Sequence, residues 1–215
     1  MRRFELDEQG SFSWIAGDDD KLERTSTALA LDDGWLLIDA VDSPELDAAL
    51  AGRPVQGVTY LLDRHVRDTE AVASRLGAKV LVPAVLAGRG EPLEIPGVQE
   101  RVIVSLVGWN ESALWLPDRG LLVCVEALGT APFFLGRPGD RLGVHAFLRL
   151  RPPRGAVGGL PVRALAVGHG EPLRGEGLGA EIDDVLDRAR RDLPRLAGRA
   201  LAAGARRLTG RSSAA

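Results

Sequence analysis

The polar sequence Asp63-Arg64-His65-Val66-Arg67-Asp68-Thr69 joins a predicted buried strand to a predicted helix. The apolar run at residues 57–62 precedes it and suits a strand covered on both faces. Residues 68–76 have apolar side chains at near-helical spacing and end at Gly77, a common helix terminator. Ligands in open α/β sheets bind at the carboxyl ends of strands, so we expect residues 63–69 to line a functional site.

Short strands and turns surround this segment on both sides. Upstream, Gly- and Asp-rich turns separate four short apolar or alternating runs, and a helix is predicted over residues 43–50. The predicted strands elsewhere cover residues 3–6, 11–15, 26–31, 35–38, 79–83, 102–107, 113–116, 120–126 and 163–167. A loop with one helix near 143–150 and a C-terminal helix over 180–208, broken or kinked at Pro194, complete the pattern. Strand-rich halves that each end in helices indicate an α/β sandwich of two sheets.

The composition is that of an ordinary globular protein. The chain has 215 residues, 45% hydrophobic and 27% charged, which predicts one domain over 1–208 and a disordered tail over 209–215. A net charge of −3 gives no electrostatic reason to expect nucleic acid or an anionic membrane as a partner. No targeting or membrane-spanning run is evident, and the single cysteine, Cys124, is consistent with a reducing compartment. We therefore expect a soluble, cytoplasmic protein.

Three polar segments follow predicted buried strands: residues 63–69, 125–130 and the sequence Gly168-His169-Gly170-Glu171-Pro172. A glycine-led loop, Gly108-Trp109-Asn110-Glu111-Ser112, lies between the first two. The order and spacing of these segments resemble the metallo-β-lactamase superfamily from about Ser26 to the C-terminal helices. The resemblance implies an αββα sandwich of two mixed β-sheets flanked by helices, and a hydrolase-like cleft.

The family's metal-binding motifs are only partly present. Its first loop usually reads Thr-His-x-His-x-Asp-His, which falls on residues 63–69 and keeps only the aspartate, Asp68. The glycine loop has Trp109 where the family has a histidine. The bridging carboxylate falls on Glu126, and the closing Gly-His-Gly-Glu-Pro is intact and supplies His169.

These losses affect one of the family's two metal positions more than the other. The resemblance places the first metal on Arg64, Val66 and Trp109, none of which binds a cation. It places the second metal on Asp68, Thr69, Glu126 and His169. Three of these four can still bind a metal, with Glu126 a conservative replacement, and only Thr69 has lost the family's histidine. Two carboxylates and one imidazole form a reasonable mononuclear site for Zn, Mn or Fe.

Two interpretations remain open. In the first, the chain is a hydrolase that works with one metal or none, with Asp68 and His65 as candidate catalytic residues, on an ester, thioester or lactone. In the second, Arg64 projects into the vacated site and pairs with Asp68 or Glu126, leaving a metal-free, non-catalytic binding or structural protein. The hydrolase-like protein is the first of these predictions and the binding or structural protein the alternative; for the cofactor, we expect a metal-free cleft over a single bound metal.

Other side chains complete the expected cleft. Arg64, Thr69, Trp109 and Asn110 are predicted to line it, and an unidentified small molecule is the expected ligand. His65 occupies a variable position of the motif, where a solvent-facing histidine or one that holds the loop is favoured over general-base catalysis. His145 lies in the irregular loop and receives no role. The sequence leaves a homodimer open.

Overall fold

Seven strands form the first sheet and follow one another in chain order. The computed structural model describes residues 1–17 and 22–210, with side chains to residue 195. The strands are β1 (Arg2–Glu5), β2 (Phe12–Ile15), β3 (Thr25–Leu31), β4 (Gly34–Ile38), β5 (Val55–Thr59), β6 (Lys79–Val82) and β7 (Glu91–Pro92). β1 to β4 pair antiparallel, whereas β4 to β7 pair parallel. The sheet is therefore mixed.

Five strands form the second sheet, and two more form a small ribbon beside it. The sheet order is β14 (Leu173–Arg174), β13 (Ala164–Val167), β10 (Leu121–Cys124), β9 (Trp109–Leu116) and β8 (Gln99–Leu106). Only β10 and β13 pair parallel. The ribbon pairs β11 (Leu128–Gly129) with β12 (Gly143–Val144).

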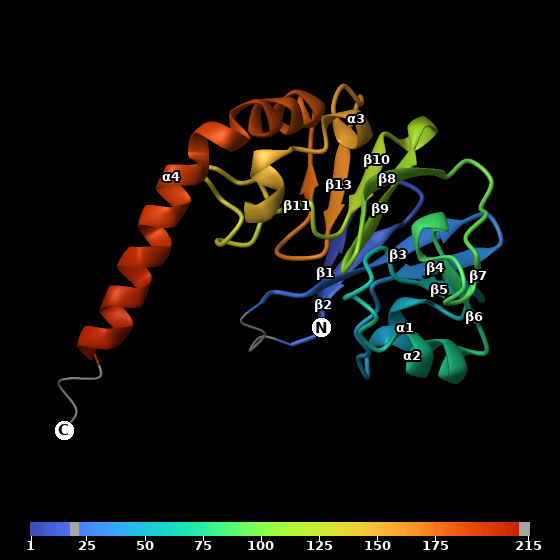
Figure 1. Cartoon of the computed structure of the whole chain (residues 1–215). Helices are drawn as coiled ribbons and strands as arrows, with labels where there is room; N and C mark the ends of the chain where they lie inside the picture. Colours follow the sequence, from blue (N-terminus) through green and yellow to red (C-terminus); the bar gives the residue numbers. More distant parts are fainter. Residues whose placement is uncertain (18–21, 211–215) are drawn as a thin grey trace.

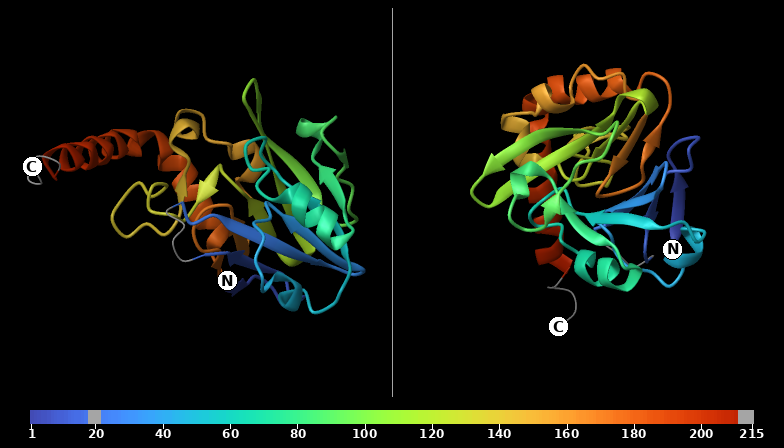
Figure 2. Two further views of the ribbon diagram at one scale, coloured as in Figure 1. Left: turned by 90° about the horizontal axis from the view of Figure 1, so that it is seen from below. Right: turned by 90° about the vertical axis from the view of Figure 1, so that its right-hand side faces the viewer.

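Helices cover the outer faces of both sheets (Figures 1 and 2). α1 (Leu46–Ala49) and α2 (Thr69–Leu76) lie against the first sheet, and α3 (Arg154–Val157) and the first part of α4 (Leu178–Gly210) lie against the second. The C-terminal part of α4 projects away from the sandwich. Within residues 1–17 and 22–210, three 3₁₀ turns complete the fold: η1 (Ala84–Leu86), η2 (Pro117–Arg119) and η3 (Ala146–Leu150). The αββα sandwich expected from the sequence is confirmed.

Alternation along the strands builds three apolar layers. On β4, Leu36 and Ile38 face the second sheet, while Leu37 faces α1 and α2. On β10, Val123 faces the first sheet and Leu122 faces α4. Each of these side chains is at most 1% exposed, and burial of one such side chain contributes about 1.5–3 kcal/mol. This packing fixes the strand ends from which the site residues project.

Several helix boundaries differ from those predicted. The helix expected at 43–50 is the single turn α1, because the Ser43 hydroxyl bonds to the Glu45 side chain and the N-cap falls at Glu45. The helix expected near 143–150 is η3, and the C-terminal helix continues through Pro194 to Gly210. Of the expected tail at 209–215, the last five residues lie outside the described chain. Within the described part, no helix is long and apolar enough to cross a membrane.

Candidate metal centre

Two pairs of parallel strands, β4 with β5 in the first sheet and β10 with β13 in the second, end near one another, and a polar residue follows each strand. Asp39 directly follows β4, and His65 lies in the loop after β5. Glu126 and His169 follow β10 and β13 in the second sheet. Because the carboxyl ends of parallel strands meet at one edge, these side chains converge, as was expected for residues in this part of the fold.

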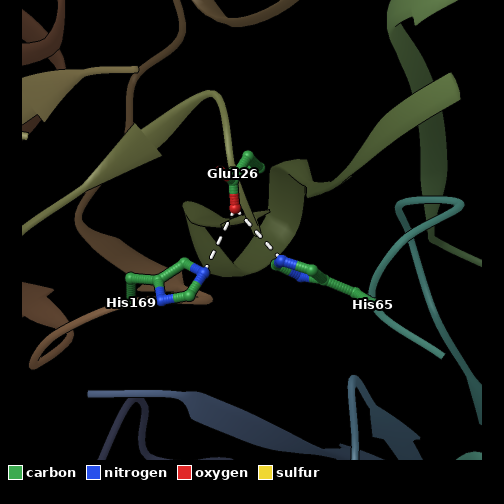
Figure 3. A group of neighbouring side chains, drawn as sticks. All are labelled: His65, Glu126 and His169. Carbon is green, nitrogen blue, oxygen red and sulfur yellow. Dashed lines mark ion pairs between the residues drawn. The ribbon is translucent and has the colours of Figure 1, made fainter. Parts of the chain in front are cut away.

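All three histidines of the chain surround the carboxylate of Glu126 (Figure 3 draws two of them). The Nε2 atoms of His65 and His169 lie 3.1 and 3.2 Å from Oε2 of Glu126. The Nε2 atom of His145 lies 3.2 Å from the other oxygen, Oε1. Burial would raise the pKa of Glu126, but the surrounding imidazoles outweigh it and hold that pKa well below its usual range. Glu126 is therefore a carboxylate at neutral pH.

A second glutamate, on β9, fixes the backbone that carries Glu126. Oε1 of Glu111 accepts hydrogen bonds from the backbone N–H groups of Glu126 (3.0 Å) and Ala127 (2.8 Å). Its Oε2 accepts from Nε1 of Trp109 at 3.0 Å. Glu111 is fully buried, and this burial raises its pKa to about 7. Its bonds hold the turn after β10 in place.

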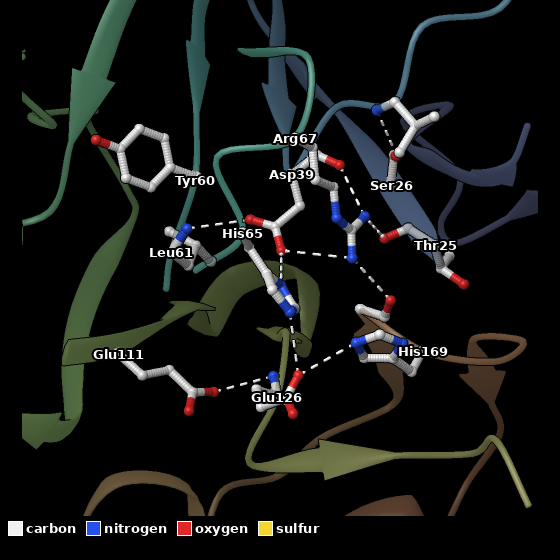
Figure 4. Close-up of polar contacts among 12 residues, drawn as sticks. Thr25, Ser26, Asp39, Tyr60, Leu61, His65, Arg67, Glu111, Glu126 and His169 are labelled. Carbon is white, nitrogen blue, oxygen red and sulfur yellow. Dashed lines mark hydrogen bonds and ion pairs between the residues drawn. The ribbon is translucent and has the colours of Figure 1, made fainter. Parts of the chain in front are cut away.

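His65 is oriented by Asp39 (Figure 4). Oδ2 of Asp39 lies 2.5 Å from Nδ1 of His65, and Oδ1 accepts from the backbone N–H of Leu61 at 3.1 Å. Burial would lower the pKa of His65, but the charge and hydrogen bond of Asp39, helped by Glu126, raise it to about 9. In the absence of a metal, His65 is thus an imidazolium between two carboxylates.

Arg67 ties the two sheets together beneath this pair. Its guanidinium donates to the carbonyl oxygens of Thr25 (2.7 Å), Asp39 (2.8 Å) and Gly168 (3.0 Å). These carbonyls belong to the start of β3 and the ends of β4 and β13. Arg67 therefore links the strand ends that carry Asp39 and His169.

Two glycines allow His169 to sit close to the neighbouring loops. A Cβ atom on Gly168 would lie 2.2 Å from the carbonyl oxygen of Val125, and one on Gly170 would lie 2.2 Å from Oγ1 of Thr130. Gly170 also has a positive φ of 91°. Nδ1 of His169 donates to the carbonyl oxygen of Leu22 at 2.8 Å, which leaves Nε2 facing Glu126.

The donor set fits a single divalent metal ion. His65, Glu126 and His169 each offer one ligand atom, and these atoms lie within 4.8 Å of one another. Both histidines use Nδ1 for a hydrogen bond, the arrangement that metal-binding imidazoles commonly have. Oε2 of Glu126 is buried and has no hydrogen bond of good geometry. Ligands at zinc-like distances around a tetrahedral ion lie about 3.4 Å apart, close to the observed spacing of Oε2 from the two Nε2 atoms.

A pocket of about 420 Å³ opens onto this cluster. Three arginines and two apolar side chains line it together with the cluster: Arg24, Arg64, Arg67, Leu22 and Phe133. Phe133 and Phe134 also pack against the ring of His169, with centroid separations of 5.6 and 6.0 Å. A larger pocket of about 640 Å³ lies at the opposite, acidic edge and contains none of the three histidines.

Asp68, predicted as a metal ligand and catalytic residue, is not in the cluster. Its side chain is exposed, and Oδ2 accepts a hydrogen bond from the backbone N–H of Asp42 at 2.9 Å. The chain turns sharply before α2, with Arg67 at a positive φ of 47°. This turn directs His65 and Arg67 inward and Asp68 outward. The cluster therefore contains the imidazole of His65 where the carboxylate of Asp68 was predicted.

Arg64 also differs from its predicted position. It lines the pocket, but Nη1 donates to the carbonyl oxygen of Gly108 and the guanidinium stacks on Trp109 at 4.6 Å from the ring centroid. In the described residues it forms no ion pair with Asp68 or Glu126. The expected salt bridge across the vacated site is therefore absent there.

The other predicted cleft residues are divided between the rim and the loops behind it. Trp109 packs edge-on against His145, with ring centroids 4.9 Å apart. Asn110 bonds to Oδ2 of Asp63 through its backbone and side-chain nitrogens. Thr69 is buried at the start of α2, and its hydroxyl has no hydrogen-bond partner among the residues that the structure describes.

Several residues that orient the cluster were given no role in the sequence, among them Asp39, Glu111 and His145. Asp39 and Glu111 are acidic residues next to or within apolar strands, where a buried carboxylate needs a specific partner. This was the available signal for both. His145 is separated from Glu126 by an irregular loop, and only the pairing of β11 with β12 brings it back to the site.

The raised pKa of His65 predicts how the stability of the metal-free protein depends on pH. The folded pKa is about 9 and the unfolded value is 6.5, so the folded state binds more protons between these values. This contribution is fully present below pH 6.5 and is lost as pH rises to about 9. We expect the free energy of unfolding to fall by on the order of 1–3 kcal/mol over this range.

Urea unfolding of chelator-treated protein at several pH values measures this effect. The His65→Asn variant is the control, because it removes the titrating group, and its profile should be flatter. A wild-type stability that stays constant or rises between pH 6.5 and 9 would contradict the assignment.

Comparison with known proteins supports the fold. No protein-family model matches the sequence, and no curated protein is detectably similar to it. Solved structures do match: a metallo-β-lactamase from Hirschia baltica has a TM-score of 0.56 and 9% identity, over 86% of this chain and 97% of that chain. A putative diflavin flavoprotein fragment from Nostoc sp. PCC 7120 has a TM-score of 0.60 and 14% identity, over 89% and 96%.

A third match is the metallo-β-lactamase FIM-1 from Pseudomonas aeruginosa in its mono-zinc form, with a TM-score of 0.50 and 13% identity over 88% and 96% of the two chains. Structural matches at such low sequence identity establish the fold of this chain but not its activity. The two mixed sheets, their flanking helices and these matches agree with the resemblance noted in the sequence. The chain therefore has the metallo-β-lactamase fold.

Proposed function

We propose that the cleft binds one divalent metal ion through His65, Glu126 and His169, and that the protein is a hydrolase acting on an ester, thioester or lactone. The convergence of two Nε2 atoms on the buried, unsatisfied Oε2 of Glu126 carries this proposal. Two imidazoles and one carboxylate are a common ligand set for catalytic zinc and non-haem iron. This reverses the preference for a metal-free cleft drawn from the sequence.

A divalent cation in such a site supplies Lewis-acid chemistry, by polarising a carbonyl group or acidifying a water molecule. The protein's own residues prepare the ligands for it. Asp39 and the carbonyl oxygen of Leu22 hold the two rings so that Nε2 faces inward. Glu111 fixes the backbone at Glu126. The orientation of the ligands is thus set before a metal arrives.

The surroundings of the cluster favour a substrate with both negative charge and an apolar part. Arg24 and Arg64 give the pocket positive charge next to the site. An arginine at this place stabilises negative charge that is present in a substrate or develops on an acyl oxygen. Leu22 and Phe133 are 53% and 47% exposed and offer apolar contact at the pocket mouth.

Metal analysis combined with a hydrolysis screen tests this proposal. Protein purified without chelator and supplied with Zn, Mn or Fe(II) should retain about one ion per chain and hydrolyse at least one member of an ester, thioester and lactone panel. The His169→Ala variant should lose both the ion and the activity. A folded wild-type protein that retains none of these metals and hydrolyses none of the substrates would refute the proposal.

A second function is supported by the charge state of His65. Its raised pKa allows an imidazolium to neutralise Asp39 and Glu126 without a metal, as a binding protein with a vestigial cleft would require. In that case added metal would leave the melting temperature unchanged. A metal that binds only the folded state must raise it, so thermal unfolding with and without EDTA distinguishes the two functions.

A further inference from the structure

His145 contacts Glu126 but belongs neither to the sequence motifs nor to the proposed metal ligands. It begins η3, directly after β12, and its backbone N–H donates to the carbonyl oxygen of Ala127 at 3.0 Å. This bond places the ring next to Glu126, and the Nε2 atom lies 3.2 Å from Oε1. The other two histidines lie against the other carboxylate oxygen, Oε2.

The hydrogen bond at the other ring nitrogen decides which atom carries the proton. Nδ1 of His145 accepts from the backbone N–H of Phe147 at 3.3 Å. A ring that accepts at Nδ1 carries its proton on Nε2. That proton faces Oε1. His65 and His169 differ from His145 at Nδ1, because in both rings Nδ1 donates, to the Asp39 carboxylate and to the Leu22 carbonyl oxygen.

The ring of His145 is also held in place by its neighbours. It packs edge-on against Trp109 at 4.9 Å and contacts Phe134 at 5.8 Å. Arg149, which is 2% exposed, donates to the carbonyl oxygens of Val144 and Phe134 and so anchors the segment on both sides of the ring. A side chain fixed in this way can define the orientation of a carboxylate.

From these contacts we infer that His145 is a positioning residue, which holds Oε1 of Glu126 through its Nε2–H and leaves Oε2 for the metal. This inference rests on the proposed metal site. His145 itself is not a metal ligand in this arrangement. It restricts Glu126 to binding through one oxygen, and it donates to that ligand as outer-shell residues of metal sites do.

The three histidines make the tautomers directly measurable. ¹⁵N NMR of the untagged, chelator-treated protein should show three imidazole rings, with His145 as the Nε2–H tautomer. Addition of one equivalent of zinc should change the Nε2 signals of His65 and His169 and leave His145 in the same tautomer. A His145 ring protonated at Nδ1, either without zinc or on zinc addition, would overturn the inference.

Variants of His145 give an independent test through zinc affinity. His145→Leu should weaken zinc binding about 10- to 100-fold, as loss of an outer-shell partner commonly does. His145→Gln keeps an N–H donor near the same position and should restore most of the affinity. Leu150→Ala, on the same 3₁₀ turn and 65% exposed, is the matched control and should bind zinc as the wild type does.

The two experiments separate failure of this inference from failure of the proposed function. If wild type and His145→Leu bind zinc equally well, the metal site stands and the role of His145 is refuted. If the wild type binds no zinc, the proposed function fails, and with it the role of His145 in metal binding. The tautomer in the zinc-free protein then decides whether His145 holds Glu126 at all.

Discussion

Glu126→Gln should abolish stoichiometric metal binding. Glu126 supplies the one negative charge among the proposed ligands, and its Oε2 lies within 3.2 Å of both ligand imidazoles. Glutamine is nearly the same size but is neutral, and its amide protons would face His65 or His145. Loss of one partner in a buried charged cluster typically costs about 3–5 kcal/mol, so we expect the dissociation constant for zinc to rise at least about 100-fold. Competition with a chromophoric chelator measures this change.

Asp68→Asn is the matched control for this variant. Both substitutions replace a carboxylate with an amide, but Asp68 is exposed and bonds to the backbone of Asp42, which an amide oxygen can also do. Zinc affinity should therefore stay within about threefold of the wild-type value, a difference under 0.7 kcal/mol. If instead Asp68→Asn lost the metal and Glu126→Gln kept it, the assignment from the sequence motif would be preferable to the one from the geometry.

Gly168→Ala should be among the most destabilising substitutions in the protein. The added Cβ would lie 2.2 Å from the carbonyl oxygen of Val125 and 3.0 Å from its carbonyl carbon. Both atoms belong to the backbone after β10, so relief requires the loops after β10 and β13 to separate. Those loops carry Glu126 and His169. We expect a loss of about 3 kcal/mol or more in the free energy of unfolding, at the upper end for overpacking, measured by urea unfolding.

Gly155→Ala provides the control for the loss of a glycine. Gly155 lies in α3, and a Cβ there would meet nothing within 4 Å. Alanine favours helix over glycine by about 0.5–1 kcal/mol, so this variant should be as stable as the wild type or slightly more stable. Equal stability of the two variants would mean that the loops at Gly168 are not packed as described.

Much of the fold could be predicted because periodicity and turn residues were informative. Alternating or apolar runs bounded by glycine and aspartate indicated most of the central strands, and Gly77 correctly ended α2. The weaker predictions were short or irregular elements. The turn around Ser43 and the segment at 143–150 depend on local side-chain bonds and on the pairing of β11 with β12, which periodicity does not report.

The candidate site could be predicted only where a motif and a strand end coincided. Glu126 and His169 each lie close behind a strand that ends at Cys124 or Val167, so the sheet largely fixes their direction, and the structure brings them together. Asp68 was assigned by its place in a motif that this chain does not keep. The positive φ at Arg67 changes the direction of the loop, and His65 takes the inward position instead.

The partners of the ligands were harder to find because they come from distant parts of the chain. Asp39 meets His65 across 26 positions, and Glu111 reaches the backbone of Glu126 across 15. These contacts exist only because β4 pairs with β5 and β9 pairs with β10. A sequence pattern can mark such residues as unusual, but the pairing of strands decides what they bind.

The central claim is that His65, Glu126 and His169 form one metal site, and anomalous diffraction at the zinc edge tests it most directly. In crystals of the wild-type protein supplied with zinc, we predict a single peak in the cleft, about 2.0–2.2 Å from Nε2 of His65, Oε2 of Glu126 and Nε2 of His169. The absence of a peak among these three atoms, or a peak at Asp68 in its place, would contradict the account.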